Sequence, residues 1–176
     1  MPAQALHELL IFLESTFHVG EAEAVAEFLA LSGQPEQARG MLRGLVARGD
    51  ASDEGRALFA DLTLGQAREA IRLEGFERAV AMIDDARAVL GEDSPELAAL
   101  DALRAEARIA KLKQRADAAR VRGDLVEAYA FAQQAVDVAP DLDAARRLAD
   151  EVRTALIETL HNEALVAWRD RDVDRA

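Results

Sequence analysis

Three histidines are the residues of this chain best suited to acid–base or metal chemistry near neutral pH: His7, His18 and His161. His161 follows Glu158 by three residues, a spacing that places two ligands on one face of a helix. A structural metal site needs about four ligands, and the sequence around this pair supplies no others. We therefore expect no metal and no cofactor, and we interpret the histidines as partly exposed helix residues.

Paired carboxylates are the next candidates, because two neighbouring acids can act as general acid and general base. Such pairs occur at Asp84–Asp85 and at Glu92–Asp93. Catalytic carboxylates need burial or a close like charge, whereas these pairs fall at a predicted helix end and in a predicted turn. The chain also has no cysteine, no glycine-rich phosphate loop and no nucleophile-elbow motif. The sequence therefore predicts a protein that is not an enzyme.

A cluster of basic residues offers electrostatic recognition instead. Its seven members share one short stretch: Arg104, Arg108, Lys111, Lys113, Arg115, Arg120 and Arg122. Only Glu106 and Asp117 oppose them, and most of the seven follow a helical spacing that forms one basic stripe. The stripe predicts docking of an acidic peptide or protein, whose carboxylates the arginine forks would take. The alternative is a solvent-exposed face whose arginines pair with acids on neighbouring helices.

The overall composition limits the partners further. The 176 residues include 21 Lys and Arg against 33 Asp and Glu, a formal charge of −12. Binding to DNA or RNA needs basic surface that neutralises phosphates, so this charge argues against nucleic acid. No apolar run approaches the ~18 residues of a membrane span. The N-terminal segment lacks a basic n-region and is interrupted by Glu8 and Glu14, unlike a signal peptide. We expect a cytoplasmic protein that does not insert into membranes.

The elements that position these residues are predicted to be helices throughout. The chain has 38 alanines, and Ala, Leu, Glu and Arg, its dominant residues, are strong helix formers. Gly and Pro divide it into eight expected helices, at about 3–18, 21–32, 35–48, 53–74, 76–90, 95–122, 125–138 and 142–170. Ser94–Pro95, Asp124 and Asp141 are the expected N-terminal caps of the last three.

A frame of small residues recurs along these helices. Four pairs of alanines share a spacing of twelve residues: Ala26 and Ala38, Ala67 and Ala79, Ala116 and Ala128, and Ala164 and Ala176. Each of the first three pairs flanks a glycine, and the fourth flanks Arg171–Asp172. Apolar residues follow the second alanine at four and seven positions in three cases: Leu42 and Leu45, Ile83 and Ala86, Ala132 and Ala135. The pattern predicts helical hairpins whose axes approach closely at the alanines.

This frame resembles the tetratricopeptide repeat (TPR) family, whose hairpins carry small residues at these positions. The best match is the stretch from Leu112 to Pro140, and the candidate repeats span 19–52, 60–91, 109–142 and a truncated 157–176. The resemblance implies one all-α domain over 1–176, a right-handed helical-hairpin solenoid of about eight helices. It also implies that the first helix of each hairpin lines a concave groove, where Lys113, Asp117 and Arg120 would be exposed.

Two apolar faces lie near the ends of the chain. One belongs to the first expected helix: Leu9, Leu10, Phe12, Leu13 and Phe17. The other lies around Val166, Trp168 and Val173 in the last helix. Most of the first face is expected to be core, but an apolar face at the end of a solenoid must be capped or must bind something. The second face therefore predicts self-association or a further helix.

The features together predict a protein–protein interaction scaffold or adaptor that binds a peptide or helix of a partner. Two alternatives stay open. One is a bacterial secretion-type chaperone, because small acidic helical-hairpin chaperones resemble the first ninety residues in size and texture. The other is a structural module that assembles into homo-oligomers through its exposed ends.

Overall fold

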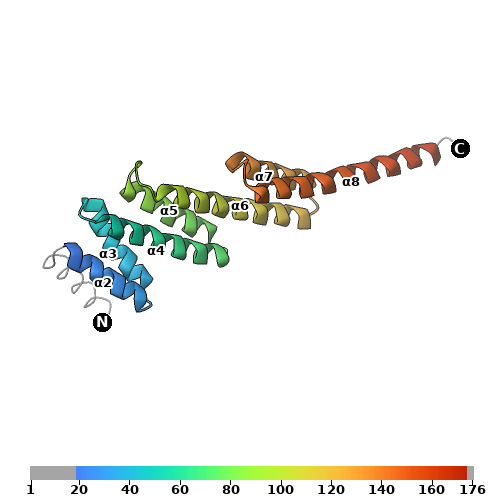
Figure 1. Cartoon of the computed structure of the whole chain (residues 1–176). Helices are drawn as coiled ribbons and strands as arrows, with labels where there is room; N and C mark the ends of the chain where they lie inside the picture. The colour runs from blue at the N-terminus through green and yellow to red at the C-terminus, as the bar shows by residue number, and fades with distance from the viewer. Residues whose placement is uncertain (1–18, 174–176) are drawn as a thin grey trace. The chain divides into compact units, whose positions relative to one another are not determined.

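The structure, a computed structural model, describes residues 19–173 and is built from helices alone within that range (Figure 1). Its helices are α2 (Val19–Leu31), α3 (Pro35–Arg48), α4 (Asp53–Arg72), α5 (Phe76–Leu90), α6 (Leu97–Val121), α7 (Leu125–Val138) and α8 (Asp143–Val173). The chain is divided into two compact units: unit 1 ends at Arg104, and unit 2 begins at Ala105. None of the described helices is both long enough and apolar enough to cross a bilayer.

Seven of the eight expected helices are present, with ends within three residues of the predicted ones. The helix expected at about 3–18 lies outside the described residues. Runs of strong helix formers separated by glycines explain this agreement, because both signals are local in the sequence.

Of the three expected caps, the structure forms only one. Asp124 caps α7, since its carboxylate accepts a hydrogen bond from the Glu127 N–H at 2.9 Å. The prediction for Ser94–Pro95 was wrong: α6 begins at Leu97, and the Ser94 hydroxyl bonds to the Glu96 carboxylate. The prediction for Asp141 was also wrong, because α8 begins at Asp143 and the Asp141 carboxylate pairs with Arg146 at 3.2 Å. In both cases a nearby side chain takes the group that would have capped the helix.

The alanine frame is confirmed in its first three copies. All six of its alanines are fully buried: Ala26, Ala38, Ala67, Ala79, Ala116 and Ala128. The apolar positions that follow them are buried as well: Leu42, Leu45, Ile83, Ala86, Ala132 and Ala135. The fourth copy differs, since Ala164 is exposed and α8 continues to Val173 where a turn at Arg171–Asp172 was expected.

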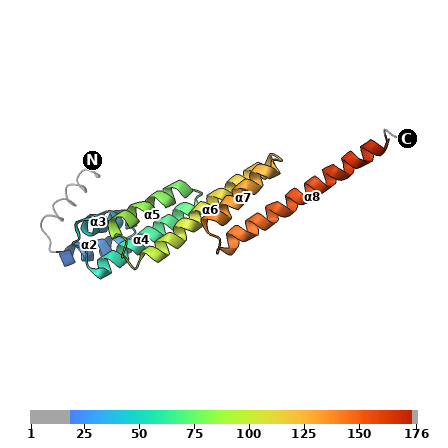
Figure 2. The same ribbon diagram turned by 90° about the horizontal axis from the view of Figure 1, so that it is seen from above.

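Unit 1 consists of two helical hairpins, α2–α3 and α4–α5, followed by the start of α6 (Figures 1 and 2). Each hairpin packs helix on helix, and α3 also packs on α4. Contacts between α2 and α4, and between α3 and α5, link each helix to its counterpart in the next hairpin. This arrangement is consistent with a helical repeat.

A polar junction joins the two hairpins at the N-terminus of α4. Ser52 caps this helix by accepting a hydrogen bond from the Gly55 N–H at 3.0 Å. Glu23 of α2 accepts two bonds from Ser52, one from its N–H at 2.7 Å and one from its hydroxyl at 2.8 Å. A Cβ on Gly55 would lie 2.1 Å from Glu23 Oε1, so only glycine leaves room for this carboxylate.

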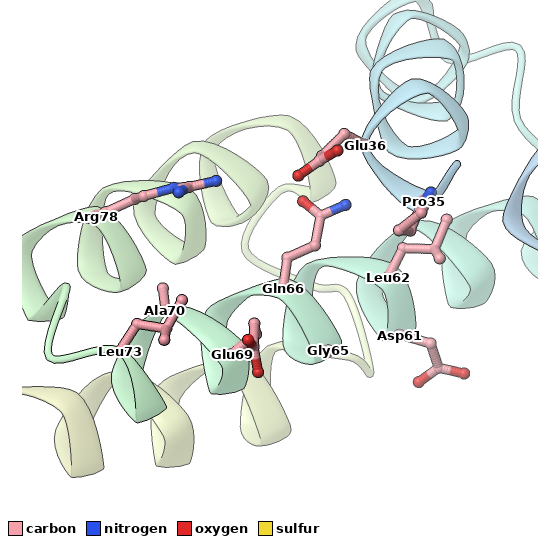
Figure 3. A pocket seen from close by; sticks show the side chains of 10 residues that line it. All are labelled: Pro35, Glu36, Asp61, Leu62, Gly65, Gln66, Glu69, Ala70, Leu73 and Arg78. Atoms are coloured by element: carbon pink, nitrogen blue, oxygen red, sulfur yellow. The ribbon is translucent and has the colours of Figure 1, made fainter. Parts of the chain in front are cut away.

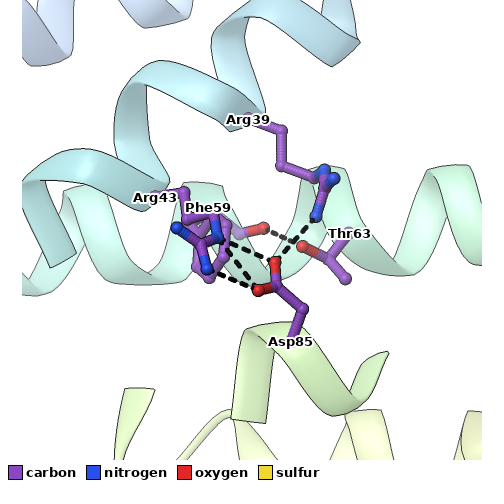
Figure 4. Close-up of polar contacts among 5 residues, drawn as sticks. All are labelled: Arg39, Arg43, Phe59, Thr63 and Asp85. Carbon is purple, nitrogen blue, oxygen red and sulfur yellow. Dashed lines mark hydrogen bonds and ion pairs between the residues drawn. The ribbon is translucent and has the colours of Figure 1, made fainter. Parts of the chain in front are cut away.

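A second polar junction connects α3 to α5 (Figure 4). The Arg43 guanidinium donates from Nε to both Asp85 oxygens at 3.0 and 2.9 Å, and from Nη2 to Oδ1 at 2.6 Å. Arg39 Nη1 lies 3.7 Å from the same carboxylate. The hydrogen bonds from Arg43, helped by the nearby charges of Arg43 and Arg39, hold the pKa of Asp85 below its usual value. The same hydrogen bonds and the negative charge of Asp85 raise the pKa of Arg43.

In unit 2, α7 and the first half of α8 pack against the later part of α6. Their shared core is built largely from small residues: Ile109, Ala116, Ala119, Ala128, Ala132, Ala135, Ala145, Leu148 and Val152. Since α7 has 14 residues and α8 has 31, α7 can cover only the first part of α8.

The Arg43–Asp85 junction predicts a pH-dependent stability. Because the pKa of Asp85 is lower in the folded than in the unfolded chain, the stabilisation is present at neutral pH and is lost as the pH falls from about 5 through the folded-state pKa. Arg43→Met should remove about 0.5–1 kcal/mol of unfolding free energy at pH 7 and less at pH 3, since both side chains are partly exposed. Urea unfolding from pH 3 to 7, with the exposed Arg68→Met as control, measures this; equal losses at both pH values would contradict it.

Candidate functional site

A groove in unit 1 follows α4 and is bounded by the start of α3 and the start of α5 (Figure 3). Its volume is about 340 Å³. Six of the residues that line it repeat every three or four positions along one side of α4, and Leu73 follows just after the helix: Asp61, Leu62, Gly65, Gln66, Glu69, Ala70 and Leu73. Pro35 and Glu36 of α3 and Arg78 of α5 complete it. We call it the α4 groove.

The floor of the α4 groove is apolar, and one buried polar group in it lacks a partner among the described residues. Leu62, Ala70 and Leu73 supply apolar surface, and Leu73 is 63% exposed although it is a large aliphatic side chain. Gln66 Nε2 is buried and has no hydrogen-bond partner in the described part of the chain. A buried amide group without a partner costs free energy, which a ligand that bonds to it would recover.

The charged groups of the groove are arranged with one sign at each end. Figure 3 shows Glu36 and Asp61 toward the end near Pro35, on opposite sides of the α4 ribbon, and Arg78 at the end near Leu73. Within residues 19–173, these three side chains form no ion pair. Glu69, by contrast, receives two hydrogen bonds from Arg72, which lower the pKa of its carboxyl group. The groove therefore offers two unpaired carboxylates and one unpaired guanidinium.

Gly65 lies in the middle of α4 and lines the groove. Glycine in a helix interior costs about 1 kcal/mol relative to alanine. No atom lies within 4 Å of a Cβ built at this position, so packing inside the protein does not require a glycine here. Its absent side chain leaves the helix backbone accessible from the groove.

The basic residues predicted as a partner site are mostly engaged with acids. Arg104 belongs to unit 1 and lies 2.6 Å from Asp84 of α5. In unit 2, Lys113 and Arg120 flank Asp117 on the same helix, at 2.6 and 3.4 Å. These pairs match the alternative in which arginines and lysines pair with neighbouring acids.

The remaining basic residues have different surroundings. Arg122 pairs with Glu127 of α7, and Arg115 lies over the Phe131 ring, 5.7 Å from its centre. Lys111 is half-buried. Arg108 is exposed and forms no ion pair with any residue that the structure describes.

The second half of α8 exposes several large apolar side chains. Large side chains there are between 48% and 68% exposed: Ile157, Leu160, Leu165, Val166 and Trp168. Val166 and Trp168 were expected in a self-association surface, and both are exposed. The side chain of the third residue, Val173, lies outside the described part.

The other candidates for chemistry are not brought together. Asp84 and Asp85, predicted to be solvated, bind Arg104 and Arg43 respectively. Glu158 and His161 lie on the exposed half of α8. No group of three or more His, Asp or Glu side chains among the described residues could hold a metal ion. His7 and His18, like the apolar residues from Leu9 to Phe17, lie outside the described residues.

Sequence reasoning missed the α4 groove because its residues come from three helices. One local signal was present: Gly65 interrupts a run of strong helix formers at a place where no helix end was expected. No comparable signal marks Glu36 or Arg78, which reach the groove only through the packing of α3 and α5 beside α4.

Comparison with known proteins adds no relative: no protein-family model, no curated protein and no solved structure matches this chain. The likeness to the TPR family therefore stays a prediction from the sequence.

The two glycines of α4 predict opposite responses to alanine. Gly65→Ala should raise the unfolding free energy by about 0.5–1 kcal/mol, because the added Cβ meets open space and alanine favours the helix. Gly55→Ala should lower it by about 1 kcal/mol, because the Cβ displaces the Glu23 carboxylate from Ser52. Urea unfolding of both variants measures the difference, and a shift of the same sign in both would contradict the assigned roles.

Proposed function

We propose that this chain is a TPR-like helical-hairpin solenoid that acts as a non-enzymatic protein–protein interaction scaffold. A short segment of a partner protein binds in the α4 groove. One observation carries this proposal: an apolar groove of about 340 Å³ contains a buried amide nitrogen, Nε2 of Gln66, that has no partner among the described residues, and an accessible helix backbone at Gly65. Apolar surface supplies affinity and a few polar groups orient the ligand in sites of this kind.

The position of the groove supports a repeat protein that binds peptides. Stacked helical hairpins leave an extended surface along one set of helices, and such surfaces bind extended or helical segments. α4 is the first helix of its hairpin, the helix that the TPR resemblance assigns to the concave side. The basic residues of α6 are a secondary contact in this proposal, because Arg108 is exposed and unpaired while most of the others already bind acids.

The groove predicts that filling it abolishes peptide binding. A library of random twelve-residue peptides displayed on phage is selected against the full chain, and the enriched peptides are then measured by calorimetry. We expect micromolar dissociation constants, with a loss of tenfold or more in Gly65→Phe, whose side chain would occupy the groove. Phenylalanine is a better helix former than glycine, so this variant should remain folded.

The matched control is Gly40→Phe. Gly40 is also an exposed helical glycine with open space around a Cβ, but it lies on α3 and does not line the groove. Equal binding losses in both variants, or no enriched peptide at all, would contradict the proposed site.

A second candidate function, self-assembly, is favoured by the distal half of α8. Every residue from Ile157 to Arg169 is exposed in the part of the chain that the structure describes. A helical stretch of this length without packing is marginal in water, and its apolar side chains gain free energy when another surface covers them. Four of the five exposed apolar side chains, Ile157, Leu160, Leu165 and Trp168, share one side of α8 by their spacing, and exposed apolar groups gathered in this way mark interaction surfaces.

This candidate predicts a mass that depends on concentration. Light scattering across a hundredfold range should show the mass rising above the 19.1 kDa of one chain, and Leu160→Glu with Trp168→Glu should return it to one chain. The control adds two acids on polar positions of the same helix, Thr154→Glu and Asn162→Glu. A constant mass of one chain in the unaltered protein would exclude assembly through α8.

A further inference from the structure

We propose that the segment bound in the α4 groove is a basic amphipathic stretch of the partner protein, an inference that rests on the function proposed above. An apolar side chain occupies the floor at Leu62 and Leu73, and a lysine or arginine lies at the Glu36 and Asp61 end. A backbone peptide group of the segment bonds to Gln66.

The charge of the surrounding unit favours this partner over an acidic one. Residues 19–104 carry 17 Asp and Glu against 9 Arg, whereas residues 105–176 carry 14 acids against 12 basic residues. Most of the negative charge of the chain therefore belongs to the part that contains the groove. A field of this sign raises the association rate of cationic segments and disfavours anionic ones.

The unpaired groups within the groove define the contacts more closely. Glu36 and Asp61 are carboxylates with no ion pair in the described residues, so each can accept a cation without first losing a partner. The acids that do have partners, Glu69 and Asp85, already bind Arg72 and Arg43. Lysine or arginine side chains of the ligand would form charge-assisted hydrogen bonds with the carboxylates of Glu36 and Asp61.

Gln66 and Arg78 complete the recognition. The amide of Gln66 has a donor at Nε2 and an acceptor at Oε1. A peptide bond of the ligand can therefore accept a hydrogen bond from Nε2 through its carbonyl oxygen and donate its N–H to Oε1. Arg78, at the opposite end from Glu36, suits a carbonyl oxygen or a carboxylate of the same segment. The groove therefore orients the ligand with its cation toward Pro35.

Three labelled probe peptides test this directly on the full chain by fluorescence anisotropy. They share leucine anchors and differ at two positions, which carry Lys, Gln or Glu. The lysine peptide should bind about tenfold tighter than the glutamine peptide at low salt, and the glutamate peptide weakest, with the differences shrinking as salt rises. An equal or tighter glutamate peptide would overturn the inference, and so would a lack of binding by all three.

Charge-reversal variants place the effect in the groove. Glu36→Lys with Asp61→Lys should weaken the lysine peptide about tenfold. Glu27 is an exposed acid of α2 outside the groove, so Glu27→Lys measures the general effect of changing the charge of unit 1. We expect it to weaken the lysine peptide two- to threefold. Circular dichroism checks that each variant is folded. A loss in Glu27→Lys as large as in the double variant would overturn the inference.

The outcomes separate this inference from the function on which it rests. If all three peptides bind equally and Gly65→Phe abolishes their binding, the groove takes peptides but does not select basic ones. If the lysine peptide binds and Gly65→Phe has no effect, both the basic segment in the groove and the proposed site fail together.

Discussion

Close approach of helix axes at alanine is the constraint on which this structure depends. Each of the three buried pairs of the frame places a methyl group where a hairpin crosses, and none leaves any exposed surface. Helices that meet through alanine pack near the lower limit of interaxial distance, about 8 Å, so a larger residue there would separate them. Small core residues also bury little apolar area each, so a larger share of the stability must come from contacts at the edges of the hairpins. The edges hold the Glu23–Ser52 junction and the Arg43–Asp85 junction, each between different hairpins.

Unequal helix lengths explain where surface is left uncovered. In unit 1, α4 has 20 residues while its neighbours α3 and α5 have 14 and 15, and the groove follows the part of α4 near its C-terminal end. In unit 2, α8 is more than twice as long as α7, and its second half is exposed. α4 extends past the start of α3, and α8 extends past α7, so each of the two longer helices has a part that this neighbour does not cover. In α4 this part combines apolar side chains with unpaired polar groups, whereas in α8 it is mainly apolar. The two features accordingly support different proposals, peptide recognition and self-assembly.

The basic residues of α6 and the carboxylates of the α4 groove differ in whether they already have ion-pair partners. The basic residues of α6 are conspicuous in the sequence, but Asp84, Asp117 and Glu127 already compensate several of them. The carboxylates of the α4 groove are inconspicuous in a chain of net charge −12, yet Glu36 and Asp61 form no ion pair with any residue that the structure describes. Recognition depends on groups that gain a partner on binding, because a group that must first lose one gains little.

Local signals in the sequence determined the helices and their buried faces. Glycine, proline and helix-forming residues act within a few positions, so the ends of the described helices were predictable to within three residues. The spacing of alanines identified the six residues at the hairpin crossings for the same reason. Caps were less predictable, because Ser94 and Asp141 had other partners within a few residues. Only the tertiary structure decided the rest: Arg43 and Asp85 are 42 positions apart, and the α4 groove joins side chains from three helices. Such contacts depend on how packed helices are aligned, a quantity that no single stretch of sequence carries.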